Sequence, residues 1–109
     1  MISEQNTGLK QQDVIDISHA ASRINNLEAL VLFGSRAKGN FRKGSDVDLA
    51  IKGPSVTYES VVQLAVELNE TSPMPYFFDV LHYDTLQEPD LKAHIDRVGI
   101  EIYSRLRSP

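Results

Sequence analysis

Two carboxylates, Asp46 and Asp48, stand one residue apart in the segment SDVDLAIKG, residues 45–53. Residues two positions apart on a strand point to the same face with Cα atoms roughly 7 Å apart, so these side chains can flank one or two cations. Mg²⁺ suits such oxygen ligands, because it keeps several waters and accepts substrate phosphates as further ligands. Two ions about 4 Å apart can stabilise both the attacking and the leaving oxygen of a phosphoryl or nucleotidyl transfer. The pair therefore predicts magnesium-dependent transfer chemistry.

A third acid, Asp79, interrupts the apolar segment YFFDVLHY, residues 76–83. If its strand neighbours that of Asp46 and Asp48, with Asp79 on the same face, three acids converge. A carboxylate beside a metal can take the proton from an incoming hydroxyl, so we expect Asp79 to be the general base. The aromatic residues Tyr76 to Phe78 are interpreted as core, although an exposed pair of them would suit an interface with a partner.

A glycine–serine turn, Gly34-Ser35, precedes Asp46 by ten intervening residues. Gly34 permits unusual dihedrals and close approach, so backbone amides and the Ser35 hydroxyl can cradle a phosphate. Such a turn can also be an ordinary helix cap, and it is the spacing to the paired acids that favours a site. Four nearby cations, Arg36, Lys38, Arg42 and Lys43, add local positive charge; we expect Arg36 and Lys43 to contact the phosphates.

The elements that must position these residues follow from hydrophobic periodicity. Apolar residues at three- and four-residue spacings predict helices over 9–27, 58–68 and from Pro89 to the stop at Gly99. Strands are predicted over 28–33, 45–53, 76–83 and 100–104. Val47 and its alternate neighbours should face the core, with the acids opposite. The order predicts an α/β (α+β) fold: a small mixed sheet with helices packed on one face and the other face partly open.

Composition bounds the remaining possibilities. The chain has 109 residues, a formal net charge of −4 and no cysteine, so we expect one domain over 1–109, with 1–8 as a flexible tail. The acidic balance argues against broad capture of nucleic acid or membrane. Without cysteines or a signal-like start, the expected location is cytoplasmic. His19 and His94 are interpreted as surface residues on helices, and His82 as a strand residue near the sheet edge.

The stretch FGSRAKGNFRKGSDVDLAI, with an acid in a later strand, resembles the signature of the DNA polymerase β-type nucleotidyltransferase superfamily. More closely, the chain is similar to the minimal nucleotidyltransferases, antitoxin-type proteins encoded beside a small helical HEPN ribonuclease toxin. The resemblance runs from about residue 10 to residue 103.

That resemblance implies a nucleotidyltransferase fold and specific roles. Ser35 and its neighbouring amides would hold the triphosphate, Asp46 and Asp48 would bind two Mg²⁺, and Asp79 would complete the metal site and activate the acceptor. The family implies transfer of AMP from ATP to a tyrosine of the partner toxin, which silences it.

Two other functions stay open from the sequence. The chain can be a binding antitoxin that sequesters the toxin without catalysis, or it can transfer nucleotides to an RNA 3′ end, against which the acidic charge argues. Exposed edges of a small sheet can pair in a homodimer or dock on the partner. The sequence does not choose among nucleotides.

Overall fold

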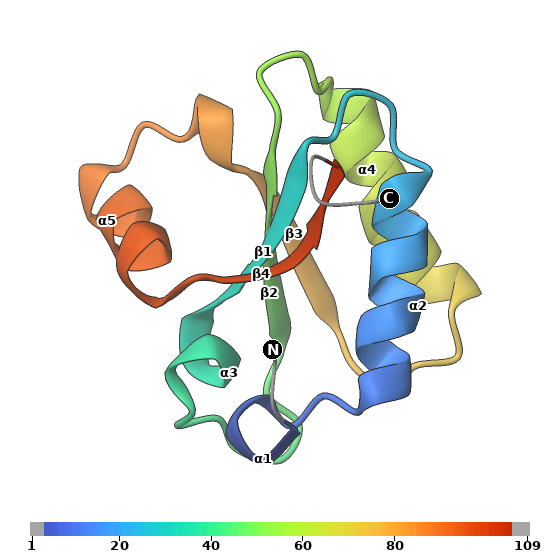
Figure 1. Cartoon of the computed structure of the whole chain (residues 1–109), viewed down its shortest axis with the longest axis vertical. Helices are drawn as coiled ribbons and strands as arrows, with labels where there is room; N and C mark the ends of the chain where they lie inside the picture. Colours follow the sequence, from blue (N-terminus) through green and yellow to red (C-terminus); the bar gives the residue numbers. More distant parts are fainter. Residues whose placement is uncertain (1–3, 106–109) are drawn as a thin grey trace.

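Four strands form one mixed sheet in the computed structural model, which describes residues 4–105 (Figure 1). The strands are β1 (Ala29–Phe33), β2 (Val47–Lys52), β3 (Phe78–His82) and β4 (Ile100–Ser104). Their spatial order is β3-β2-β1-β4. β1 runs antiparallel to both β2 and β4, whereas β2 and β3 are parallel and joined through a helical connection. The predicted mixed sheet and α/β class are confirmed.

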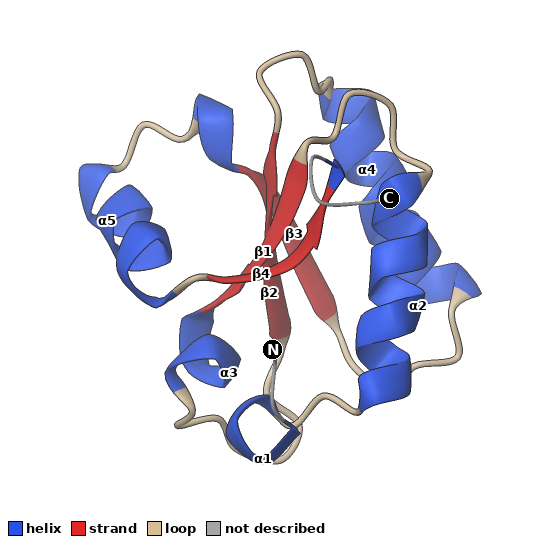
Figure 2. Cartoon of the chain, in the orientation of Figure 1, coloured by secondary structure: helices blue, strands red, loops and turns tan. Residues whose placement is uncertain are grey.

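Helical segments occupy the connections between the strands (Figure 2). They are α1 (Glu4–Thr7), α2 (Gln11–Ser22), α3 (Gly34–Lys38), α4 (Tyr58–Val66), the π-helical turn η1 (Glu67–Thr71), the 3₁₀ turn η2 (Tyr83–Thr85) and α5 (Pro89–Val98). The predicted helices over 58–68 and from Pro89 are confirmed to within a few residues. Thr57 caps α4, because its side-chain oxygen accepts the Ser60 backbone N–H at 3.2 Å.

The first long helix ends earlier than its apolar spacing predicts. α2 ends at Ser22, and Asn26 adopts a left-handed conformation with φ of 67°, which turns the chain toward β1. Ile24 and Leu27 are nevertheless 2% and 0% exposed. Their spacing therefore reports burial in the core, which a turn satisfies as well as a helix does.

α2 and α4 cover one face of the sheet and make the larger core (Figure 1). That face carries Leu32 from β1 and the alternate residues Val47, Leu49 and Ile51 of β2, each fully buried. The predicted separation of these residues from the acids on β2 is therefore confirmed.

The second face is covered in part by α5 (Figure 1). Ile95 of α5 packs with Val31, Phe33 and Ala50 in a smaller buried cluster. The sequence analysis placed the helices on one face, and α5 adds a helix on the other. The apolar residues of α5 predict a buried helix face but do not indicate which face of the sheet it covers, because that depends on the path of the loops around it.

The N-terminal segment is structured where it is described. The turn of helix α1 lies within the expected tail 1–8, and Thr7 and Leu9 are 0% and 1% exposed. Residues 1–3 of that expected tail lie outside the described residues. The contacts of Thr7 connect this segment to the candidate site below.

Candidate active site

The three acids singled out by the sequence meet at one end of the sheet. Asp48 of β2 pairs in register with Asp79 of β3, so the two side chains emerge side by side from the same face. Asp46 lies two residues before Asp48, just ahead of β2, and is near enough for its charge to raise the pKa of Asp48. Asp46 and Asp79 are exposed, whereas Asp48 is half-buried.

These acids form a row that borders the apolar cluster under α5. Phe33 of β1 is the register partner of Asp48 on the other side, giving the order Phe33, Asp48, Asp79 across three strands. The next row on the same face, Val31, Ala50 and Leu81, is apolar and belongs to the cluster with Ile95. Asp48 is thus half-buried because it stands where the cover provided by α5 ends.

The electrostatics of the row follow from this position. The pKa of the Asp48 carboxyl is raised from 3.8 to about 6, first by burial and then by the charges of Asp79 and Asp46, while Arg36 lowers it. Within residues 4–105, none of the three carboxylates has a hydrogen-bond or ion-pair partner. Clustered carboxylates that accept no hydrogen bond from the protein have oxygen atoms available to coordinate a cation.

The arrangement fits an open magnesium site rather than a closed protein cage. Nowhere in the described chain do three His, Cys, Asp or Glu side chains already surround one point. Mg²⁺ is commonly held by one or two carboxylates together with waters and substrate phosphates. The residues present therefore fit magnesium that arrives with a nucleotide, and Asp46, Asp48 and Asp79 would hold it.

The glycine–serine turn lies directly against the acid row. Gly34 follows Phe33 with φ of +75°, and a Cβ added there would collide with Oδ2 of Asp48. Glycine is therefore required twice, by its backbone conformation and by the close approach of the carboxylate. Ser35 is half-buried and is the second residue of α3. The structure thus brings the proposed phosphate turn and the proposed metal ligands together.

His94 of α5 contacts the same turn, which the sequence did not indicate. Its Nε2 accepts the backbone N–H of Gly34 at 3.2 Å, so the neutral ring carries its proton on Nδ1. The ring also stands edge-on to Phe33, with centroids 6.2 Å apart. His94 is therefore half-buried at the site rather than a surface residue.

Arg36 is buried, at 3% exposure, and its guanidinium is directed at protein backbone. Nε and Nη2 donate to the Ser45 carbonyl at 3.1 and 2.7 Å, and Nη1 donates to the Thr7 carbonyl at 2.8 Å. The rings of Phe41 and Tyr76 lie 5.1 and 5.0 Å from its central carbon.

This arrangement gives Arg36 a task other than the expected one. A guanidinium committed to carbonyls and aromatic rings is poorly placed to grip phosphate, so we retain Lys43 but not Arg36 as a candidate phosphate contact. Arg36 instead fixes Ser45, the residue before Asp46. Lys43 is exposed and lines a cavity of about 410 Å³ beside Arg36.

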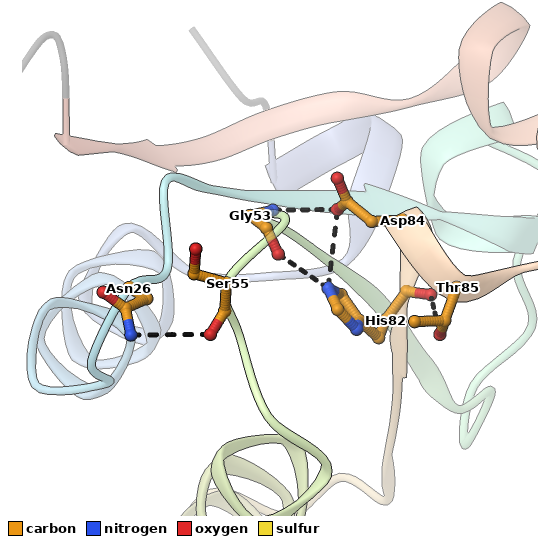
Figure 3. A network of polar contacts seen from close by, with 6 residues as sticks. All are labelled: Asn26, Gly53, Ser55, His82, Asp84 and Thr85. Carbon is orange, nitrogen blue, oxygen red and sulfur yellow. Dashed lines mark hydrogen bonds and ion pairs between the residues drawn. The ribbon is translucent and has the colours of Figure 1, made fainter.

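The opposite end of the sheet holds a polar network that stabilises the fold (Figure 3). His82 Nε2 lies 2.8 Å from the Gly53 carbonyl, and Asp84 accepts the Gly53 N–H at 2.9 Å. These contacts join the ends of β2 and β3. Because its partners are protein groups at the far end from the acid row, we assign His82 no part in the candidate site.

Phe77 also departs from the core interpretation of the sequence. Phe78 is buried at 1% exposure, as expected for a core residue, but Phe77 is 59% exposed. The signal available in the sequence was strand alternation, because Phe77 stands two residues before Asp79 and must share its face if the strand pattern extends to it.

Solved structures with this fold include toxin–antitoxin proteins. A toxin–antitoxin with AMP-PNP matches with a TM-score of 0.68 and 20% identity over 88% of this chain and 74% of that chain. A mutant of the toxin–antitoxin MntA-HpeT matches with a TM-score of 0.67 and 18% identity over 88% of this chain and 74% of that chain. A protein of Sulfolobus solfataricus assigned as a nucleotidyltransferase matches with 0.51 and 20% identity over 89% of this chain and 79% of that chain. These likenesses show the fold.

The curated proteins contain no match to this sequence. The family model described as polymerase beta, nucleotidyltransferase matches residues 6–108, almost the whole chain and every residue of the acid row and its neighbouring turn. The chain therefore belongs to the polymerase β-type nucleotidyltransferase family.

Proposed function

We propose that this nucleotidyltransferase transfers AMP from ATP to a tyrosine of a partner HEPN ribonuclease toxin and thereby neutralises it as an antitoxin. The observation that carries the proposal is the contact between the acid row and the glycine turn, where Asp48 packs against Gly34. The solved toxin–antitoxin with AMP-PNP supports ATP as the nucleotide and a toxin as the partner.

Each residue then has a defined task. The Gly34-Ser35 turn holds the triphosphate through backbone amides and the serine hydroxyl, with Lys43 as an additional cation. Asp46, Asp48 and Asp79 hold two Mg²⁺, which supply charge neutralisation at the phosphates. Asp79, exposed on the outer strand, accepts the proton of the attacking hydroxyl. The Gly34 N–H is bonded to His94, so His94 fixes the backbone where the turn begins, and the amides after Gly34 are the ones that hold the phosphates.

The test is incubation of the protein with α-labelled ATP, Mg²⁺ and the product of the neighbouring gene as the proposed toxin, with tRNA as acceptor in a parallel reaction. A double variant, Asp46→Ala with Asp48→Ala, is the matched control. Label on the toxin that disappears with the double variant would support the enzyme. Tight binding of the toxin without label, and neutralisation unaffected by the double variant, would replace it with sequestration. Label on tRNA but not on the toxin would move the acceptor to an RNA 3′ end.

A further inference from the structure

Phe77 exposes a large apolar ring beside the acid row. Its exposed fraction is 59%, whereas the ring of Phe78 is 1% exposed. Burying a phenylalanine side chain is favourable, and the fold forgoes much of this stabilisation at Phe77. Single exposed apolar side chains are common on protein surfaces, and this ring is distinguished by its position.

Its place is fixed by the pairing of β2 and β3. Val47 pairs with Phe78, and the Val47 N–H donates to the Phe77 carbonyl at 2.8 Å, so the parallel pairing extends back to Phe77. Counted one residue back along that register, Phe77 stands opposite Asp46, just before the first residue of each strand. Strand alternation places Phe77 on the face of Asp79 and opposite the buried Phe78. Phe77 is therefore placed at the end of the acid row, two residues before Asp79 and opposite Asp46 in register.

The order of strands then assigns the side from which each reactant enters. The phosphate turn follows β1, the paired acids belong to β2, and Asp79 and Phe77 belong to β3, which is an edge strand in the order β3-β2-β1-β4. In-line displacement places the attacking oxygen and the leaving group on opposite sides of the phosphorus. With pyrophosphate toward the turn after β1, the acceptor must enter over β3.

We propose that Phe77 forms the acceptor subsite, packing against the phenol ring of the tyrosine that receives AMP. This inference rests on the proposed function and specifies how the acceptor is recognised. The tyrosine Oη attacks the α-phosphorus, an O–P bond forms, the P–O bond to pyrophosphate breaks, and the phenolic proton passes to the Asp79 carboxylate. Paired aromatic rings gain stabilisation beyond that of the area they bury, so Phe77 favours tyrosine over an aliphatic hydroxyl.

The experiment compares Phe77→Ala and Phe77→Trp with the parent chain in two assays. The first measures transfer of labelled AMP to the toxin as a function of toxin concentration. The second measures binding of AMP-PNP in the presence of Mn²⁺. For Phe77→Ala we expect the KM for the toxin to rise about tenfold with kcat nearly unchanged, because the ring contributes to the ground and transition states alike. AMP-PNP affinity should stay within twofold, and Phe77→Trp should restore most of the loss.

Tyr58→Ala is the control for general loss of apolar surface. Tyr58 is 80% exposed in α4, on the opposite face of the sheet, so it should change neither assay. Weaker AMP-PNP binding by Phe77→Ala with unchanged KM for the toxin would overturn the proposal and place the ring against the nucleobase. No change in either assay would overturn it as well.

A third measurement separates this inference from the proposed function. Affinity of the toxin for the parent and for Phe77→Ala is measured directly, in the presence of AMP-PNP, with no transfer required. If the parent transfers no AMP but Phe77→Ala still weakens toxin binding severalfold, the proposed function fails and Phe77 remains a contact for the partner. Equal affinities would refute the acceptor subsite whatever the activity.

Discussion

Replacing Asp48 with asparagine should make the metal-free protein more stable, although it removes a proposed metal ligand. Asp48 is half-buried, and its pKa is raised from 3.8 to about 6 by burial and by the charges of Asp79 and Asp46. The folded state thus holds the proton more tightly than the unfolded chain does. As pH rises from about 4 to about 6, the unfolded chain ionises first, so the free energy of unfolding falls and the full loss persists above pH 6.

The size of the effect follows from the same values. At roughly 1.4 kcal/mol for each pKa unit, the difference between 3.8 and about 6 corresponds to about 3 kcal/mol. Because the carboxyl remains partly open to water, screening reduces this to about 1–2 kcal/mol. Asparagine has nearly the same shape and no charge, so Asp48→Asn should raise the free energy of unfolding at pH 7.5 by that amount. The corresponding rise in Tm is about 4–8 °C.

Urea denaturation at pH 4, 6 and 7.5 in EDTA measures the effect directly. The parent and Asp48→Asn should agree at pH 4 within error and separate as pH rises. Added Mg²⁺ and AMP-PNP should narrow the gap at pH 7.5, because they bind the folded parent through its carboxylates. Glu70→Gln is the control, since Glu70 is an exposed acid on η1 away from the row. Superimposable pH profiles, or an asparagine variant that is less stable at pH 7.5, would refute the electrostatic reasoning.

Three further predictions concern the surroundings of the row. Gly34→Ala should cost about 2 kcal/mol or more in unfolding free energy and abolish AMP transfer, because its Cβ meets Asp48 at a positive φ; urea denaturation and the label assay measure both. Arg36→Lys keeps the charge but loses the forked bond to Ser45, so Mn²⁺ affinity followed by paramagnetic resonance should fall about tenfold; unchanged affinity in the folded variant would contradict it. His94→Ala removes the acceptor of the Gly34 N–H and should cost about 1 kcal/mol, with a severalfold rise in KM for ATP; a change in stability alone would reduce His94 to a packing role.

Most of the fold follows from local patterns in the sequence. The strand ALVLF and the helix that starts at Pro89 lie within a residue or two of their predicted bounds, because period and capping signals are local. The meeting of Asp79 with the other acids was predicted only on the condition that its strand lay beside theirs. The parallel pairing of β2 with β3 meets that condition, and it depends on the whole chain rather than on either strand.

Contacts between distant segments were beyond the sequence reading. Arg36 stands among cations in a glycine-rich stretch, which is typical of an exposed residue, yet it is buried between Phe41 and Tyr76. Thr7 and Ser45 bind it through their backbone carbonyls. Every residue has a backbone carbonyl, so the residue types do not identify these partners. His94 was interpreted as a surface residue for the same reason: its partner is the Gly34 N–H, sixty residues away.

The unequal covering of the two sheet faces explains how a small fold can present charged groups without losing its core. One face is filled by α2 and α4, and this larger cluster contains most of the buried apolar residues. On the other face α5 covers the row of Val31, Ala50 and Leu81 and leaves the next row partly open. A helix that extended further would bury Asp48 more deeply and raise its pKa further, and a carboxylate held protonated is a poor metal ligand. The position at which α5 stops covering the sheet therefore determines how far Asp48 is buried while the apolar row beside it stays covered. Ile95→Val, which loosens the contact of α5 with the sheet, should lower the free energy of unfolding by about 0.5–1.5 kcal/mol. It should not weaken Mn²⁺ binding.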